Sequence, residues 1–69
     1  MSETLDPQAE AQAATEGLRG ALRQHSISLP GLAINLAGVL AGYPLVDLGS
    51  ADAETVRRIT AALRAAPMN

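Results

Sequence analysis

The chain of 69 residues contains no cysteine, no lysine, no phenylalanine and no tryptophan, and Tyr43 is its one aromatic residue. Without cysteine it forms no disulfide, and with His25 as the sole histidine it shows no recognisable spacing of metal ligands. We therefore expect no metal and no cofactor. Small folds usually gain stability from disulfides, a metal or association, and of these only association remains.

Large apolar side chains are also few. Hydrophobic residues make up 48% of the chain largely because alanine is frequent, and each buried alanine contributes little transfer free energy. A domain of this size buries only about 60% of the surface that its unfolded chain exposes. We predict a single small domain over residues 7–66, preceded by a disordered tail over residues 1–6, whose thin core favours a homodimer or a complex with a larger partner.

Positive charge is scarce, since the net charge is −2 and the basic residues are five arginines. A nucleic-acid-binding protein normally presents a basic face, so the composition disfavours, but does not forbid, a nucleic-acid partner. The first 26 residues carry acids and glutamines where a signal peptide would have its apolar region. The longest apolar stretch, residues 31–49, is interrupted by Asn35, Pro44 and Asp47, so we expect no membrane span and a cytoplasmic location.

Two segments carry the signals of a helix. Asp6 followed by Pro7 is typical of a helix start, because the aspartate caps free amides and proline lacks an N–H that would need a partner. Apolar residues then recur at three- and four-residue spacing, which predicts a helix over residues 7–25. Ser50 as a cap, followed by acids and a second periodic run, predicts another helix over residues 51–66.

The apolar segment between these helices fits a β-hairpin. Leu32, Ile34 and Leu36 alternate with smaller or polar residues, as expected for a strand with one buried face. A second strand over residues 44–49 begins with proline and ends with glycine, which leaves residues 38–43 as the hairpin loop. The predicted fold class is α+β, in the order helix, β-hairpin, helix, with both helices covering one face of the hairpin.

An all-α alternative comes from the sequence ADAETVRRITAALRAA at residues 51–66. It resembles the closing helix of Cro/phage-repressor-type helix-turn-helix domains, where Thr-Val/Leu-x-Arg-Ile-x-x-Ala-Leu is a common pattern. The resemblance implies a degenerate helix-turn-helix with residues 39–48 in the place of the recognition helix. That segment departs from the family, because it contains Pro44 and no Arg, Lys, Gln or Asn to contact base edges.

A second resemblance rests on a skeleton of scattered residues. The skeleton Leu-Pro-x-Leu … Leu-Val-x-Leu-Gly … Ala-x-x-Leu is similar to that of short uncharacterised actinomycete proteins. No activity comes with this resemblance, which slightly favours a regulatory role. The residues that carry it are Leu29, Pro30, Leu32, Leu45, Val46, Leu48, Gly49 and Ala62.

Residue types suited to nucleophilic catalysis are present but are not arranged in a known motif. His25, nearby serines and the carboxylates of Asp47 and Glu54 are the kinds of group that a hydrolase uses. No nucleophile elbow or oxyanion loop accompanies them, and a histidine at a helix end is explained by the dipole and the last carbonyls. We therefore expect a protein that is not an enzyme.

The remaining candidates point to a protein partner. The three arginines of the last helix fit either a solvated flank or contact with an acidic partner surface, because arginine pairs carboxylates bidentately and packs on apolar surface. Tyr43 fits either a core plug or an exposed anchor. The predicted partner-binding residues are Leu32, Ile34, Leu36, Tyr43, Leu45, Val46, Arg57, Arg58 and Arg64.

From these observations we expect a non-enzymatic protein–protein interaction module, a small regulatory or accessory protein. It would act as a homodimer, with two hairpins paired into a four-stranded sheet, or with a larger partner. The alternatives are a small DNA-binding transcriptional regulator and a subunit that is active only within a larger enzyme complex.

Overall fold

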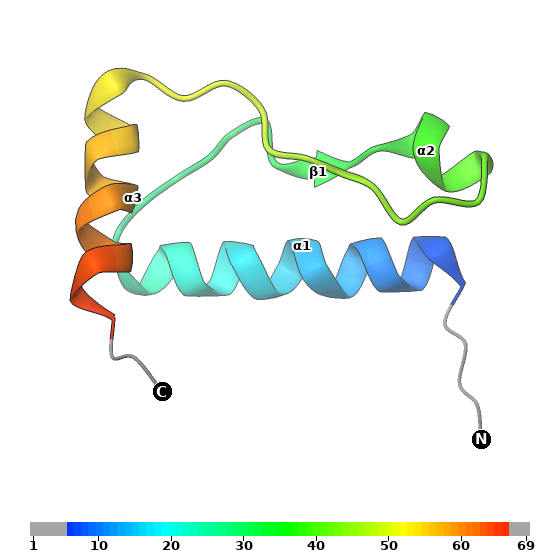
Figure 1. Cartoon of the computed structure of the whole chain (residues 1–69), viewed down its shortest axis with the longest axis horizontal. Helices are drawn as coiled ribbons and strands as arrows, with labels where there is room; N and C mark the ends of the chain where they lie inside the picture. The colour runs from blue at the N-terminus through cyan, green and yellow to red at the C-terminus, as the bar shows by residue number, and fades with distance from the viewer. Residues whose placement is uncertain (1–5, 67–69) are drawn as a thin grey trace.

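The structure is a computed structural model that describes residues 6–66. The predicted tail therefore lies outside the described residues, except for Asp6. The elements are three helices and two strands, and their order confirms the α+β class and the sequence of helix, hairpin and helix (Figure 1). They are α1 (Pro7–Gln24), β1 (Ala33–Ile34), α2 (Leu36–Leu40), β2 (Val46–Asp47) and α3 (Ala53–Ala65).

Helix α1 begins where the sequence predicts it. The Oδ1 atom of Asp6 accepts a hydrogen bond from the Ala9 amide at 2.7 Å, and Pro7 occupies the first turn. The buried Thr15 hydroxyl donates to the Ala11 carbonyl at 2.8 Å, which satisfies a polar group on the face that packs against the hairpin.

The C-terminal end of α1 is a Schellman motif without glycine. Ser26 has a positive φ of 57°, and its amide donates to the Arg23 carbonyl at 3.0 Å. The Ile27 amide donates to the Leu22 carbonyl at 2.9 Å, and both of these side chains are buried. This pattern ends the helix, places an apolar pair at the turn and directs the chain back along α1.

The hairpin is shorter than predicted, and the predicted loop over residues 38–43 is wrong in part. The strands pair antiparallel over two residues each, with Ile34 opposite Val46. Leu36, predicted to lie in the first strand, instead begins α2. The cause is Asn35, whose Oδ1 accepts from the Gly38 amide at 2.7 Å and whose Nδ2 donates to Asp47 Oδ1 at 3.0 Å. One side chain thus caps α2 and ties it to β2.

The two ends of the hairpin segment meet at a pair of glycines. A Cβ atom placed on Gly31 would lie 2.8 Å from the Cα of Gly49, and one placed on Gly49 would lie 2.5 Å from the Cα of Gly31. Gly49 also has a φ of +79°. Only glycine at both positions allows the backbones to approach this closely.

The core lies between α1 and the hairpin segment, and it is small. Among the described residues the buried apolar side chains are those of Ala11, Leu22, Ile27 and Leu32. The Arg19 guanidinium reinforces this contact by donating to the Leu32 carbonyl at 2.9 Å. The helix and the hairpin are therefore held together by both apolar packing and a polar clamp.

Helix α3 differs from its prediction in where it begins and in what it covers. Asp52, not Ser50, is the N-cap, and its Oδ1 accepts from the Thr55 amide at 2.8 Å. The prediction that both helices cover the hairpin is wrong for α3, because the extensive contacts among the elements involve α1, α2 and the strands alone. Figure 1 shows α3 standing across the C-terminal end of α1. No residue of α3 is buried.

The molecule is a thin slab. Its Cα atoms span 37 × 29 × 14 Å, and in the view down the shortest axis α1, the hairpin and α3 lie beside one another with little overlap (Figure 1). Most domains bury their apolar faces between two packed layers. Here the elements form little more than one layer, so both broad faces remain open to solvent.

Candidate interaction surface

Large apolar side chains lie mostly on the outside of this slab. The core contains three of them, Leu22, Ile27 and Leu32. A single exposed leucine needs no explanation, but a chain that exposes more large apolar side chains than it buries does. Within residues 6–66 the exposed ones are Leu36, Leu40, Tyr43, Leu45, Leu48, Val56 and Leu63.

One group of exposed apolar side chains lies at the tip of the hairpin. Leu36 and Leu40 are four residues apart on α2 and share a face of that helix. Leu40 is 84% exposed and Tyr43, in the segment that leads to β2, is 62% exposed. The side chain of Leu45 covers the buried Gly38, and a Cβ atom placed on Gly38 would lie 2.6 Å from the Cδ1 atom of Leu45. The tip therefore presents an apolar surface on a small, tightly packed base.

The second group surrounds a groove between α1 and α3. This groove has a volume of about 370 Å³, more than twice the ~150 Å³ of an engineered apolar cavity that binds benzene. Leu63, at its edge, is 72% exposed. We call it the α1–α3 groove, and its walls are formed by Leu18, Ala21, Leu22, His25, Leu29, Leu48, Ile59, Ala62, Leu63 and Ala66.

A stripe of small residues runs along α1 and reaches the groove at Ala21. Ala14, Gly17 and Ala21 follow one another at three- and four-residue spacing, so they lie on one stripe of α1. All three are exposed, and a Cβ atom on Gly17 would meet no other atom within 4 Å. A second helix can approach this stripe closely.

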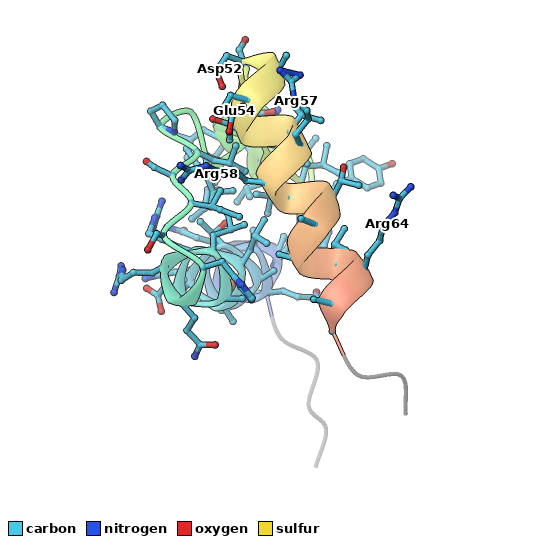
Figure 2. All side chains as sticks on the ribbon, turned by 90° about the vertical axis from the view of Figure 1, so that its left-hand side faces the viewer. Asp52, Glu54, Arg57, Arg58 and Arg64 are labelled. Atoms are coloured by element: carbon cyan, nitrogen blue, oxygen red, sulfur yellow. The ribbon has the colours of Figure 1, made fainter. Side chains whose placement is uncertain are left out.

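The three arginines of α3 have different surroundings. The Arg58 Nη1 atom donates to the Ser26 carbonyl at 3.4 Å, and in Figure 2 its side chain points toward the chain that leaves α1. Arg57 and Arg64 point away from the rest of the molecule in the same view. Arg58 thus helps to hold α3 in place, whereas the other two edge the open side of the helix.

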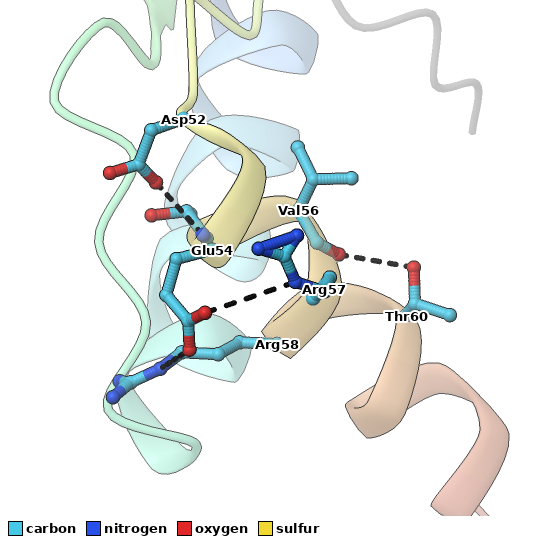
Figure 3. A network of polar contacts seen from close by, with 7 residues as sticks. Asp52, Glu54, Val56, Arg57, Arg58 and Thr60 are labelled. Carbon is cyan, nitrogen blue, oxygen red and sulfur yellow. Dashed lines mark hydrogen bonds and ion pairs between the residues drawn. The ribbon is translucent and has the colours of Figure 1, made fainter.

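A network at the start of α3 orders its first turn (Figure 3). Glu54 lies 3.9 Å from the Arg57 Nε and 3.6 Å from the Arg58 Nε. These ion pairs are exposed, so each contributes little to stability. The hydrogen bond from Thr55, with a smaller contribution from the charge of Arg58, lowers the pKa of the Asp52 carboxyl below its usual 3.8. The cap is therefore ionised over the whole neutral range.

The structure brings together some of the predicted partner-binding residues and separates others. Leu36, Tyr43 and Leu45 gather at the tip, and Ile34 and Val46 are half-buried opposite each other in the hairpin. Leu32 is only 4% exposed, so it belongs to the core and offers no surface. The three arginines lie on α3, at the other end of the slab from α2 (Figure 1).

Sequence reasoning missed the residues of the α1–α3 groove. Leu18 and Leu63 sit on the apolar faces of their helices, and an apolar face is normally assigned to the core. The signal that these faces stay partly open was the small number of large side chains in the chain, because a core of three such residues cannot cover two helices. Leu40 was missed because it fell within the predicted loop over residues 38–43, and Leu48 because it fell within the predicted second strand over residues 44–49.

The groups considered for catalysis are engaged elsewhere or lie apart. The Asp47 carboxylate accepts from Asn35, and the Glu54 carboxylate faces two arginines. His25 lines the α1–α3 groove. Within residues 6–66 no three histidine, cysteine or acidic side chains gather closely enough to hold a metal ion.

In the part of the chain that the structure describes, no helix combines the length and the apolar character needed to cross a bilayer. Comparison of the chain with family models, with curated proteins and with solved structures gives no match.

Proposed function

We propose that this chain is a non-enzymatic, cytoplasmic interaction module that acts by covering its exposed apolar side chains with a protein partner. The observation that carries the proposal is that the described residues expose more large apolar side chains than they bury. Three large apolar side chains are buried in the described residues, and seven are about half exposed or more. Burial of apolar surface is the main source of free energy in protein association, so this surface is suited to a partner.

Charge supports a protein rather than a nucleic acid as that partner. The chain has a net charge of −2, and Glu54 is shared by two of the arginines on α3. Little uncompensated positive charge is left for phosphates, whereas Arg57 and Arg64 beside apolar side chains match the composition of protein interfaces. A nucleic-acid complex would also weaken steeply with salt.

Photo-cross-linking in the host cell tests the proposal. A photoreactive residue replaces Leu63 at the groove or Leu40 at the tip, and a matched control places it at Gln12, which is exposed on the polar flank of α1. We expect a discrete cross-linked product from position 63 or 40 and none from position 12. Equal, diffuse labelling at all three positions would contradict the proposal, and so would a product made only from position 12.

A further inference from the structure

We infer that the α1–α3 groove is filled by helix α3 of a second copy of this chain, in a symmetric dimer. The inference rests on the proposed function and specifies its partner. In such a dimer each copy supplies both a groove and the helix that enters its partner's groove, so that the same surfaces are used twice. Three features of the molecule favour a second copy over an unrelated protein.

The first feature is the open side of α3. Helical spacing places Val56, Thr60 and Leu63 on a flank next to the half-buried Ile59. Leu63 is 72% exposed and Val56 is 49% exposed, while the Thr60 hydroxyl is already bonded to the Val56 carbonyl at 3.0 Å. This flank is therefore apolar and needs no polar partner, and it matches the apolar walls of the groove.

The second feature is the fit between that flank and α1. The stripe of Ala14, Gly17 and Ala21 enters the groove at Ala21 and leaves room beside it for the larger side chains of α3, because nothing lies near Gly17. Large side chains against small ones give close helix packing. The charges agree at one position, since Glu10 lies four residues before Ala14 on the same stripe of α1 and the open side of α3 is edged by Arg57 and Arg64.

The third feature is area. A standard interface covers about 800 Å² on each partner, and a broad face of this slab measures 37 × 29 Å. Stacking two slabs would also supply the second layer that the single chain lacks. The strand edges offer much less, because each strand is only two residues long. The groove, rather than the pairing of hairpins expected from the sequence, is thus the surface that we assign to the dimer.

Sedimentation equilibrium of the purified chain, from about 1 to about 200 µM, gives the first test. We expect a species of twice the 7.1 kDa chain mass. Leu63→Asp should weaken the dimer about 100-fold, because it places an unpaired charge on the apolar flank of α3 that enters the partner's groove. The matched control is Leu40→Asp, which changes an even more exposed leucine at the tip and should shift the dissociation constant less than about 3-fold.

A second pair of variants protects the test against a folding defect. Ala21 lines the groove, whereas Ala13 is exposed on the same helix outside it. Both accept glutamine as a good helix former, so both variants should keep the far-ultraviolet circular dichroism of the wild type. We expect Ala21→Gln to weaken the dimer at least about 10-fold and Ala13→Gln to leave it unchanged.

A chain that stays monomeric at all these concentrations overturns the inference, and so does a dimer weakened more by Leu40→Asp or Ala13→Gln than by the groove variants. The proposed function fails separately. If the purified chain is monomeric but position 63 still cross-links to a different protein in the cell, the second copy is wrong and the interaction module stands. If neither dimer nor cross-link forms, both are wrong.

Discussion

Helix α1 contacts two other parts of this small protein, the hairpin segment and α3, and the two contacts differ in kind. Along most of its length α1 packs on the hairpin segment through buried side chains, and Arg19 clamps the Leu32 carbonyl at 2.9 Å. At its C-terminal end it meets α3, in which no residue is buried and which donates one long hydrogen bond, from Arg58 to the Ser26 carbonyl. The first contact buries most of the core, and the second leaves large apolar side chains exposed.

Truncation of a buried side chain between α1 and the hairpin segment should give the largest loss in the free energy of unfolding. Leu22→Ala deletes most of one of the three large core side chains, and such changes cost about 2–5 kcal/mol through lost burial and the cavity left behind. We expect urea unfolding followed by circular dichroism to show loss of most of the native state. Leu63→Ala, measured below the concentration at which the chain associates, should cost less than about 1 kcal/mol. Equal losses from the two variants would contradict the distinction between the two regions.

The glycine pair at the base of the hairpin should give the next largest effect. Gly49→Ala forces a side chain into a left-handed conformation and against the Gly31 backbone, and we expect a loss of about 2 kcal/mol or more. Gly20→Ala is the control, because the space around Gly20 is open and alanine should raise helix stability by about 0.5–1 kcal/mol. Thermal unfolding of the two variants should therefore move in opposite directions from the wild type.

The turn between α1 and the hairpin offers a small gain. Ser26 adopts a positive φ, and glycine at this position of a Schellman motif removes the steric cost of the Cβ atom. We expect Ser26→Gly to raise the free energy of unfolding by about 0.5–1 kcal/mol in urea titrations. Ser28→Gly, two residues beyond in the extended connection, is a matched control and should lower it or leave it unchanged.

The smallest effect concerns α3 alone and depends on pH. The pKa of Asp52 in the folded protein lies below 3.8 because its ionised carboxylate accepts a hydrogen bond from the Thr55 amide. The stabilisation of α3 by the ionised Asp52 cap is therefore complete above pH 3.8 and is lost as the pH falls through the folded pKa. We expect the Thr55 amide signal in NMR spectra to shift across that acidic range and the first turn of α3 to fray. In Asp52→Asn, where the cap does not titrate, this transition should disappear.

The sequence predicted the two long helices, α1 and α3, well because their ends carry chemical signals. Asp6 followed by Pro7 marks the start of α1, and the observed helix begins at Pro7 as expected. The end of α1 and the cap of α3 were less clear. The turn after α1 uses Ser26 where glycine is common, and both Ser50 and Asp52 are good N-caps, so only the structure distinguishes them.

The hairpin shows why a short alternating pattern is ambiguous. Leu32, Ile34 and Leu36 have the two-residue period of a strand, and the strand pair does form at Ile34. Asn35, the polar residue of that pattern, is also a strong helix cap. Its bond to the Gly38 amide starts α2, and five helical residues replace the second half of the predicted strand.

The candidate interaction surface was the least predictable part. Periodicity in α3 identifies an apolar face but does not say what covers that face. Helical spacing places Val56, Ile59 and Leu63 on one side of the helix, and the structure leaves Val56 and Leu63 exposed. The partner-binding residues chosen from the hairpin include Leu32, which is buried, because burial within such a short segment depends on the path of the whole chain.

The contact between Gly31 and Gly49 has a consequence for how the protein can change over evolution. Because the two backbones meet there, residues 31–49 form a closed lobe whose entry and exit points lie against each other. Insertions, deletions or an exchanged sequence at the far end of that lobe leave the positions of α1 and α3 unaltered. The same scaffold should therefore tolerate different tips, and Leu40 and Tyr43 occupy the segment where we expect the fewest constraints from α1 and α3.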